Sequence, residues 1–150
     1  NKGAKSIAFI GGRDQLFVSR ERLNGYKKAL QEHGLEVDEK LIAQVDEFTR
    51  ERGYETIKEL LAEGTIDGLV TADSLFTEGA VRYLNEAHIQ IPIITFDSVQ
   101  PSVHIDAYVD IHTFELGRSA FKLLRNVINS NDSQNQMCYR QIVSHSIKEM

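Results

Sequence analysis

The sequence is poor in residues that crosslink, stiffen or anchor a chain. Of its 150 residues, one is cysteine, two are proline and none is tryptophan. The single cysteine, Cys138, excludes an internal disulfide framework and any metal site built from several thiolates. No apolar run approaches the roughly 20 residues that span a bilayer, and the N-terminal stretch NKGAKSIAFIGG lacks the apolar segment of an export signal. These absences favour a cytoplasmic protein with no membrane partner, although a mature exported protein would show the same pattern.

Positive charge is also scarce. The chain has 17 Lys and Arg against 22 Asp and Glu, a formal net charge of −5, and no long basic stretch. Proteins that bind nucleic acid cluster their cations against the phosphates, so these residues are not expected to bind DNA themselves. With 41% hydrophobic residues, the chain is instead apolar and long enough to form one compact core.

Short β-rich runs alternate with helical patterns along the chain. This alternation is typical of βαβ units, which build a mainly parallel sheet flanked by helices on both faces. The predicted fold class is therefore α/β and doubly wound. The polar stretch 129–136 is expected to be a loop. Strands are predicted at 6–10, 39–45, 67–72, 92–96, 107–111 and 137–145, and helices at 20–33, 49–64, 78–88 and 114–128.

The helix predicted at 20–33 begins with an unfavourable charge pattern. The Ser19 hydroxyl is placed to cap this helix by accepting from a backbone N–H. Arg20 and Arg22 would then fall in the first turn, where the helix dipole favours acids instead. The pattern raises the question of what a guanidinium group binds at this position.

Candidate ligand-binding residues follow the predicted strands. Ligands of doubly wound sheets bind at the carboxyl ends of the strands, where the sequence places Asp73, Asp97 and, near a third strand, Arg22. A lone Asp at such a position more often caps the next helix or turn. Two carboxylates that accept from hydroxyls, facing a guanidinium that donates, suit a sugar or another small polyhydroxylated molecule.

Two further features have both a structural and a functional interpretation. Phe48, in the charged stretch VDEFTRERGY, is either a core side chain at the entry of a helix or an aromatic wall that covers a sugar ring. Gly11 and Gly12 lack the spacing of a dinucleotide motif or a P-loop. They are expected to let the chain turn sharply beneath a ligand.

Catalytic and metal-binding patterns are missing from the sequence. The five histidines form no H-E-x-x-H or similar pair, so we expect no metal site and no cofactor. No serine lies in a G-x-S-x-G elbow, and the strand ends lack the acid pair and lysine of a response-regulator receiver. The chain is therefore expected to bind a ligand without catalysing a reaction.

Several stretches of the chain resemble the effector-binding core of the lactose/galactose repressor family. They occur in the family's order and cover almost the whole chain. The resemblance implies the fold of periplasmic sugar-binding proteins and a transcriptional regulator, a repressor, that binds a small sugar-like effector and forms a homodimer. It also implies operator binding only through an N-terminal headpiece, which we expect to precede Asn1 in a longer protein. The stretches are KSIAFIGG, SRERLNGYKKALQEHGL, RGYETIKELLAEGTIDGLVTADS, GAVRYLNEAHIQIP, TFDS and ELGRSAFKLL.

The resemblance implies which residues bind the effector. Arg22 matches the Arg of the family's R-x-x-G-[YF] motif, which holds the effector in an interdomain cleft. Asp97 matches the acid of the G-[FY]-D turn, and Phe48 the aromatic of the cleft. Asp73 matches the acid of the A-N-D turn, whereas Arg20 matches no contact and is expected to be solvated.

The resemblance also implies how the chain is divided. Residues 1–106 form a C-terminal effector-binding subdomain, 107–136 a crossover strand and helix that belong to an N-terminal subdomain, and 137–150 a return strand. Without that second subdomain, the apolar helix 114–128 is expected to dock on its own sheet or on a second copy of the chain. The alternative function is a periplasmic-type sugar-binding receptor of an uptake system, which the sequence upstream of Asn1 would distinguish.

Overall fold

The computed structural model describes residues 3–129 and 143–149. Its strands form one sheet in the order β2-β1-β3-β4-β5-β6, parallel throughout except that β6 runs antiparallel to β5. The elements in chain order are β1 Ile7–Gly12, α1 Phe17–Glu32, the 3₁₀ helix η1 Glu39–Leu41, β2 Ile42–Val45, α2 Arg50–Glu63, β3 Gly68–Thr71, α3 Ser74–Glu86, β4 Ile93–Phe96, β5 Ala107–Asp110, α4 Thr113–Asn129 and β6 Ser146–Glu149.

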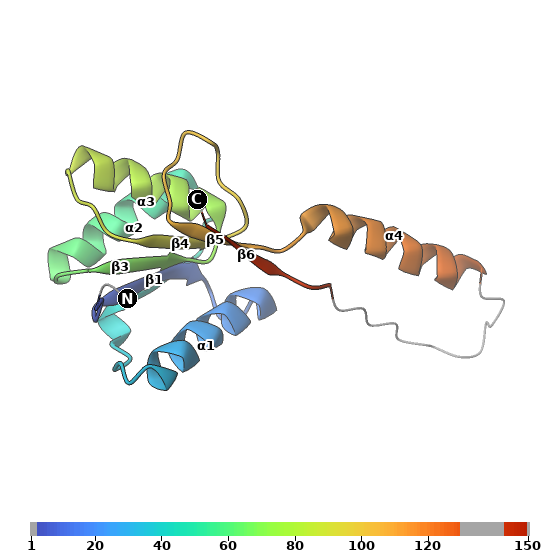
Figure 1. The fold of residues 1–150 in the computed structure, drawn as a ribbon, viewed down its shortest axis with the longest axis horizontal. Helices are drawn as coiled ribbons and strands as arrows, with labels where there is room; N and C mark the ends of the chain where they lie inside the picture. The colour runs from blue at the N-terminus through green and yellow to red at the C-terminus, as the bar shows by residue number, and fades with distance from the viewer. Residues whose placement is uncertain (1–2, 130–142, 150) are drawn as a thin grey trace.

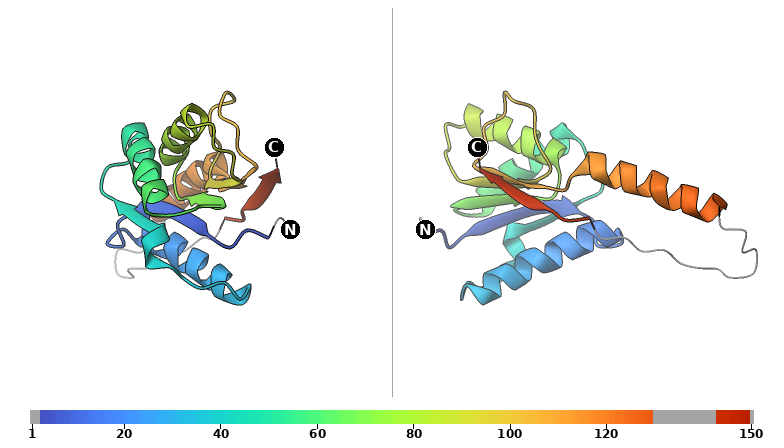
Figure 2. Two further views of the ribbon diagram at one scale, coloured as in Figure 1. Left: turned by 90° about the vertical axis from the view of Figure 1, so that its left-hand side faces the viewer. Right: turned by 45° about the vertical axis from the view of Figure 1, so that its right-hand side comes forward.

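Helices cover the two faces of the sheet unequally (Figure 1). Helices α2 and α3 lie side by side on one face, whereas α1 lies alone on the other (Figure 2). The side chains of β1 alternate accordingly, because Ala8 and Ile10 join the core under α2 and α3, while Phe9 joins the smaller core under α1. The predicted α/β fold, with a mainly parallel sheet and helices on both faces, is confirmed.

Glycines let α2 and α3 approach each other closely. Gly79 of α3 faces the backbone carbonyl of Arg50, and Gly53 of α2 faces the backbone of Phe76. A Cβ atom at either glycine would overlap the backbone of the opposite helix. These contacts fix α3 relative to the sheet, and thereby the turn that precedes α3.

Gly79→Ala is expected to lower the free energy of unfolding by about 1–3 kcal/mol, because overpacking must push the two helices apart. Urea unfolding followed by circular dichroism measures this change. Gly25→Ala on α1 is the matched control, since no described residue outside its own stretch of helix lies within 4 Å of a Cβ built there, and it should be neutral or stabilising. Equal stability of the two variants would show that the contact between α2 and α3 is loose.

Helix α1 begins earlier than predicted. The Leu16 N–H donates to the Arg13 carbonyl (3.2 Å), and the turn they form leads directly into a helix that starts at Phe17. Ser19 is therefore not the cap: Leu16 occupies that position without a side-chain hydrogen bond, and Ser19 is buried inside the helix. Arg22 consequently lies in the second turn, where the dipole acts weakly. The predicted conflict between Arg22 and the helix dipole is wrong.

The end of the chain differs in part from the prediction. The strand predicted at 137–145 lies mostly outside the described residues, and its described part, 143–145, is not a strand. The last strand, β6, follows these residues directly. The loop predicted at 129–136 also lies outside the described residues, apart from Asn129, where α4 ends.

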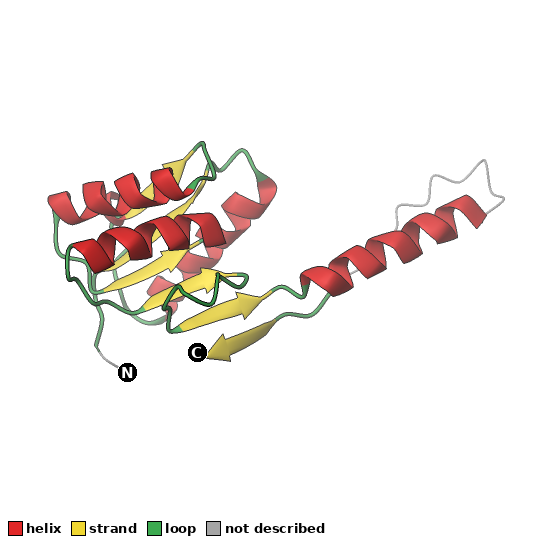
Figure 3. Ribbon diagram, turned by 90° about the horizontal axis from the view of Figure 1, so that it is seen from above, coloured by secondary structure: helices red, strands yellow, loops and turns green. Residues whose placement is uncertain are grey.

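Helix α4 leaves the sheet at the end of β5 and projects away from the other helices (Figure 3). None of its residues is buried, and the side chains of Phe114 and Ile128 are 79% and 70% exposed. The expectation that this helix packs on its own sheet is therefore wrong for this structure. Docking on a second copy of the chain stays a prediction.

Candidate functional site

The four predicted site residues gather at the edge of the sheet where the parallel strands end. Phe48 follows β2, Asp73 follows β3 and Asp97 follows β4, while Arg22 belongs to the helix that follows β1. The strand order β2-β1-β3-β4 brings these four segments next to one another. This is the edge at which ligands bind in doubly wound sheets.

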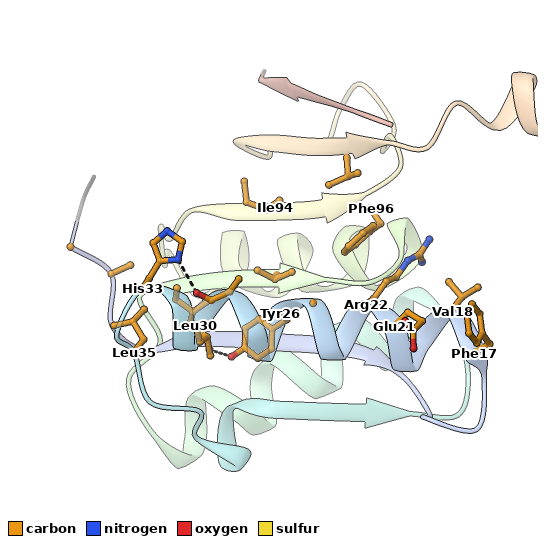
Figure 4. Close-up of a pocket in the computed structure, with 17 residues that line it drawn as sticks. Phe17, Val18, Glu21, Arg22, Tyr26, Leu30, His33, Leu35, Ile94 and Phe96 are labelled. Atoms are coloured by element: carbon orange, nitrogen blue, oxygen red, sulfur yellow. Dashed lines mark hydrogen bonds between the residues drawn. The ribbon is translucent and has the colours of Figure 1, made fainter. Parts of the chain in front are cut away.

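Arg22 is held between two strand ends. Its side chain is half-buried, and its Nη1 donates to the carbonyl oxygen of Ala72 at 2.6 Å. Its guanidinium carbon lies 4.6 Å from the centroid of the Phe96 ring, a cation–π geometry. Figure 4 shows the two side chains next to each other, Arg22 near the start of α1 and Phe96 at the end of β4. The end of β3 and the last residue of β4 thus orient the guanidinium.

The charges at this edge act on one another without forming an ion pair. Burial lowers the pKa of the Arg22 guanidinium, and the Asp73 and Asp97 carboxylates oppose this change by raising it. Within the described part of the chain, no ion pair joins Arg22 to either carboxylate. The guanidinium stays protonated at neutral pH. All three groups therefore keep hydrogen-bonding capacity for a ligand.

Asp73 caps α3. Its Oδ1 accepts from the Leu75 N–H at 2.8 Å, and the helix begins at Ser74, four residues before the predicted start at residue 78. Asp73 thus has the helix-capping role that is the more common one for a lone Asp at this position. Among residues 3–129 and 143–149, no group donates to the other oxygen, Oδ2. One oxygen of Asp73 caps the helix, and the other is available to a ligand.

Asp97 has a left-handed backbone, with a φ of 67°. Asp adopts this region more readily than most residues, and such strained positions cluster at ligand sites. Its Oδ1 accepts from the Ser98 N–H (2.9 Å), and its Oδ2 accepts from the Thr113 hydroxyl (3.2 Å). The carboxylate is therefore oriented by its own turn and by the first residue of α4.

Phe48 has the predicted core role, since its ring stacks on Phe76 with a centroid distance of 5.0 Å and packs against the core under α2 and α3. The ring is only partly buried, so its role as an aromatic wall stays a prediction. Gly12 lies beneath it, and a Cβ there would overlap the Phe48 ring. The two glycines therefore leave space for neighbouring aromatic rings. The expected sharp turn is wrong, because β1 runs through Gly11 and Gly12 and neither has a positive φ.

Two features of this edge are not evident from the sequence. Arg13, just after β1, forms an ion pair with Asp46, just after β2. Phe96 contacts Arg22, and its position directly before Asp97 is the signal that could have identified it. Arg20 is exposed, as expected, with its guanidinium carbon 5.5 Å from the centroid of the Phe17 ring.

Three buried threonine hydroxyls lie beneath the turns that carry Asp73 and Asp97. The Oγ1 of Thr77 lies 2.6 Å from that of Thr71 and 2.7 Å from that of Thr95. It also lies 2.9 Å from the carbonyl oxygen of Asp73. All three threonines are fully buried. The network links the end of β3, the first turn of α3 and β4, and so maintains the separation of the two carboxylates.

Neither a cluster of metal ligands nor a membrane-spanning helix is found among the described residues. No group of three or more His, Cys, Asp or Glu side chains among them is arranged to hold a metal ion. None of the described helices is long and apolar enough to cross a membrane.

Comparisons with known proteins identify the family of the chain and support its fold. The family model described as "Periplasmic binding protein-like domain" matches residues 1–146. The chain belongs to this family. Within it, the HTH-type transcriptional regulator MalR of Streptococcus pneumoniae serotype 4 is 43% identical over 149 residues, which cover 99% of this chain and 45% of MalR. The chain thus spans less than half the length of this relative.

Solved structures of related regulators have the same fold. A sugar-binding transcriptional regulator of the LacI family from Escherichia coli, in complex with phosphate, is 27% identical with a TM-score of 0.80, over 98% of this chain and 54% of the other. The structure of the transcriptional regulator CelR in complex with cellobiose is 26% identical with a TM-score of 0.85. The match covers 97% of this chain and 46% of CelR. The resemblance to the lactose/galactose repressor family is confirmed, and these relatives are regulators rather than enzymes.

Phe96→Leu is expected to release the Arg22 guanidinium from its position in this periplasmic binding protein-like domain, with the loss of a contact worth about 1 kcal/mol. The nitrogen-15 NMR spectrum of the Arg22 Nε–H group measures this directly, because the aromatic ring shifts that resonance. Phe96→Tyr, which keeps a ring at the same place, should leave the resonance nearly unchanged. A resonance that stays in place in both variants would show that Phe96 does not orient Arg22.

Proposed function

We propose that the chain is the effector-sensing and dimerisation region of a transcriptional regulator, a repressor of the lactose/galactose family. The observation that carries this proposal is the convergence of Arg22, Asp73 and Asp97 at the carboxyl edge of the sheet, in a chain 43% identical to a regulator. Phe48 lies at the same edge as the aromatic of the site. None of these groups forms a nucleophile–base set, which supports binding without catalysis. The similarity to a transcriptional regulator supports a location in the cytoplasm.

The charge of the site favours a neutral, polyhydroxylated effector. Two carboxylates face one guanidinium, and the nearby Arg13 is neutralised by Asp46. The net negative charge of the edge disfavours an anion such as a sugar phosphate. Carboxylates accept from sugar hydroxyls, while the partly desolvated Arg22 donates to hydroxyl or ring oxygens more strongly than it would in water. CelR, a relative by structure, binds the uncharged disaccharide cellobiose in its complex.

We propose that the chain is divided as the family pattern implies, into residues 1–106, 107–136 and 137–150. The exposed α4 beyond β5 and the return of β6 beside β5 support this division. In a longer regulator, α4 would then pack on a second lobe that closes the cleft over the carboxyl edge. Contact with operator DNA would come only from a headpiece outside this chain.

The longer regulator provides the test of this function. The upstream coding sequence should encode a DNA-binding headpiece, and a neutral mono- or disaccharide should change the affinity of the regulator for its operator in a fluorescence anisotropy titration. The 6-phosphate of the same sugar should act at least about tenfold more weakly because of the charge of the site. An upstream export signal in place of a headpiece would favour the receptor of an uptake system.

A further inference from the structure

The two strands that lead to the site aspartates end in the same short pattern. The end of β3 reads T-A-D at residues 71–73, and the end of β4 reads T-F-D at residues 95–97. Thr71 and Thr95 are direct partners in the parallel register of the two strands. Each threonine therefore stands at the base of a turn that carries one carboxylate of the candidate site.

Packing alone does not account for threonine at these two positions. Thr71 and Thr95 are fully buried, and they share a face of the sheet with the core residues Leu69 and Ile93, two positions earlier in the same strands. Valine has nearly the same shape and carries no hydroxyl, whose burial is costly unless it is hydrogen-bonded. The hydroxyls at the ends of β3 and β4 thus point to a role beyond packing.

Thr77 of α3 joins the two threonines. Helix α3 packs over β3 and β4 (Figure 1), and the Thr77 Oγ1 lies 2.6 Å from that of Thr71 and 2.7 Å from that of Thr95. The same atom lies 2.9 Å from the carbonyl oxygen of Asp73. Thr77 is also fully buried, so water does not replace a partner that turns away.

The Thr77 hydroxyl has one proton and two acceptors that compete for it. These acceptors are the carbonyl oxygen of Asp73 and the Oγ1 of Thr95. A threonine hydroxyl donates once and can accept twice, so Thr71 is left to donate to Thr77. Thr95 donates onward to the carbonyl oxygen of Phe96 at 3.3 Å. The network therefore has two arrangements, which differ in the acceptor that takes the Thr77 proton.

Each arrangement favours a different turn. With the proton on the Asp73 carbonyl, the turn before α3 gains a hydrogen bond beside the one from the Thr77 N–H (3.2 Å). With the proton on Thr95, that hydroxyl is polarised and donates more strongly to Phe96, directly before Asp97. A ligand that displaces one turn thus biases the position of the proton, and with it the other turn. Such a two-state element is the physical requirement for coupling between two groups.

We propose that Thr77 is a positioning residue of the effector site, whose single hydroxyl proton couples the turn of Asp73 to the turn of Asp97. The two carboxylates then bind an effector as one unit rather than as independent acceptors. This inference rests on the proposed function in one respect, namely that the ligand of both carboxylates is the effector. The coupling itself is a property of the ligand-free protein.

Carbon-13 NMR of the longer regulator without sugar tests the coupling. Thr95→Val removes one of the two acceptors of the Thr77 proton, so the carbonyl resonance of Asp73 should shift. In a chain that also carries Thr77→Val, the Thr95 substitution should leave this resonance in place. Thr56→Val is the matched control, because Thr56 on α2 is 2% exposed and its hydroxyl has no partner among the described residues. An equal shift with and without the Thr77 hydroxyl, or no shift in either case, would overturn the proposal.

The amides that donate to the two carboxylates show whether Thr77 positions them. The N–H groups of Leu75 and Ser98 donate to the site aspartates, so their nitrogen-15 resonances report the orientation of each carboxylate. Thr77→Val should shift both resonances, whereas Thr77→Ser, which keeps the hydroxyl, should restore them. Thr77→Val leaves the Thr71 hydroxyl without an acceptor, so Thr71→Val/Thr77→Val serves as the second variant if the first unfolds. Shifts confined to one of the two amides would contradict the coupling.

Calorimetric titration connects the coupling to binding, with the neutral sugar that changes operator affinity as the probe. In the unmodified regulator, the affinity loss of Asp73→Asn/Asp97→Asn should differ from the product of the single losses by at least about threefold. In the Thr71→Val/Thr77→Val background, it should equal that product. The same relation in both backgrounds would overturn the proposal. A sugar whose affinity depends on neither aspartate would contradict the proposed function instead, while the sugar-free resonances decide the coupling.

Discussion

In the longer regulator, Arg22→Ala is expected to abolish the response to the effector and to lower the free energy of unfolding by only about 1 kcal/mol. The loss of effector binding is large because Arg22 is the positively charged donor of the site, close enough to Asp73 and Asp97 for their charges to affect its pKa. Ala72 and Phe96 hold the guanidinium in position. The structural loss is small because Arg22 makes one hydrogen bond and one ring contact. Its removal also relieves the cost of partly burying a charge.

Calorimetric titration of the effector and thermal unfolding of the same samples separate these two effects. Arg20→Ala is the matched control, since that guanidinium is exposed and contacts only Phe17 and Glu21 among the described residues. It should change neither the affinity nor the stability. A large loss of stability in Arg22→Ala with normal effector binding would assign Arg22 a structural role instead.

Asp97→Asn is expected to weaken binding of a sugar effector by about 1–3 kcal/mol, the cost of losing a charged hydrogen-bond partner. The substitution tests the charge alone, since Asn also tolerates the left-handed backbone at this position. The remaining side-chain oxygen can still accept from the Ser98 N–H. Unfolding by urea should therefore show little change, while calorimetric titration shows the loss of affinity.

Asp73→Asn is expected to have a smaller effect on affinity and serves as the comparison. Asn caps a helix about as well as Asp, so α3 should keep its start at Ser74. One oxygen of Asp73 is already engaged by the Leu75 N–H, which leaves the ligand a single free acceptor atom. Unchanged affinity in both variants would leave Asp73 and Asp97 with only their capping and turn roles.

The fold and the place of the site follow from local patterns in the sequence. Alternating strand and helix signals predict parallel pairing, and parallel pairing brings the strand ends to one edge. Asp73 and Asp97 could therefore be predicted as neighbours although they lie on different strands. Local patterns alone did not predict the role of Arg22. That prediction came from the resemblance of the RERLNGYKKAL stretch to a known family. The structure adds the partners that orient Arg22.

Two kinds of feature could not be predicted: a helix start without a capping side chain, and contacts between residues that are distant in the sequence. The early start of α1 is of the first kind, since Leu16 stands at the cap position and makes no side-chain hydrogen bond there. The clearance at Gly12 depends on Phe48, which arrives from another strand end. The contact between Arg22 and Phe96 depends on how far α1 reaches across β3 and β4. The partner of α4 was also undetermined, because a helical pattern shows an apolar face and not the surface that covers it.

The Arg22 Nε–H resonance in the longer regulator, followed by nitrogen-15 NMR during titration with a neutral sugar effector, tests the central claim most directly. If Arg22, Asp73 and Asp97 form the effector site, this resonance and the backbone amides of both aspartates shift together and saturate with the dissociation constant that calorimetry gives. A sugar that binds with measurable heat while these resonances stay in place would show that the effector binds elsewhere and contradict the account.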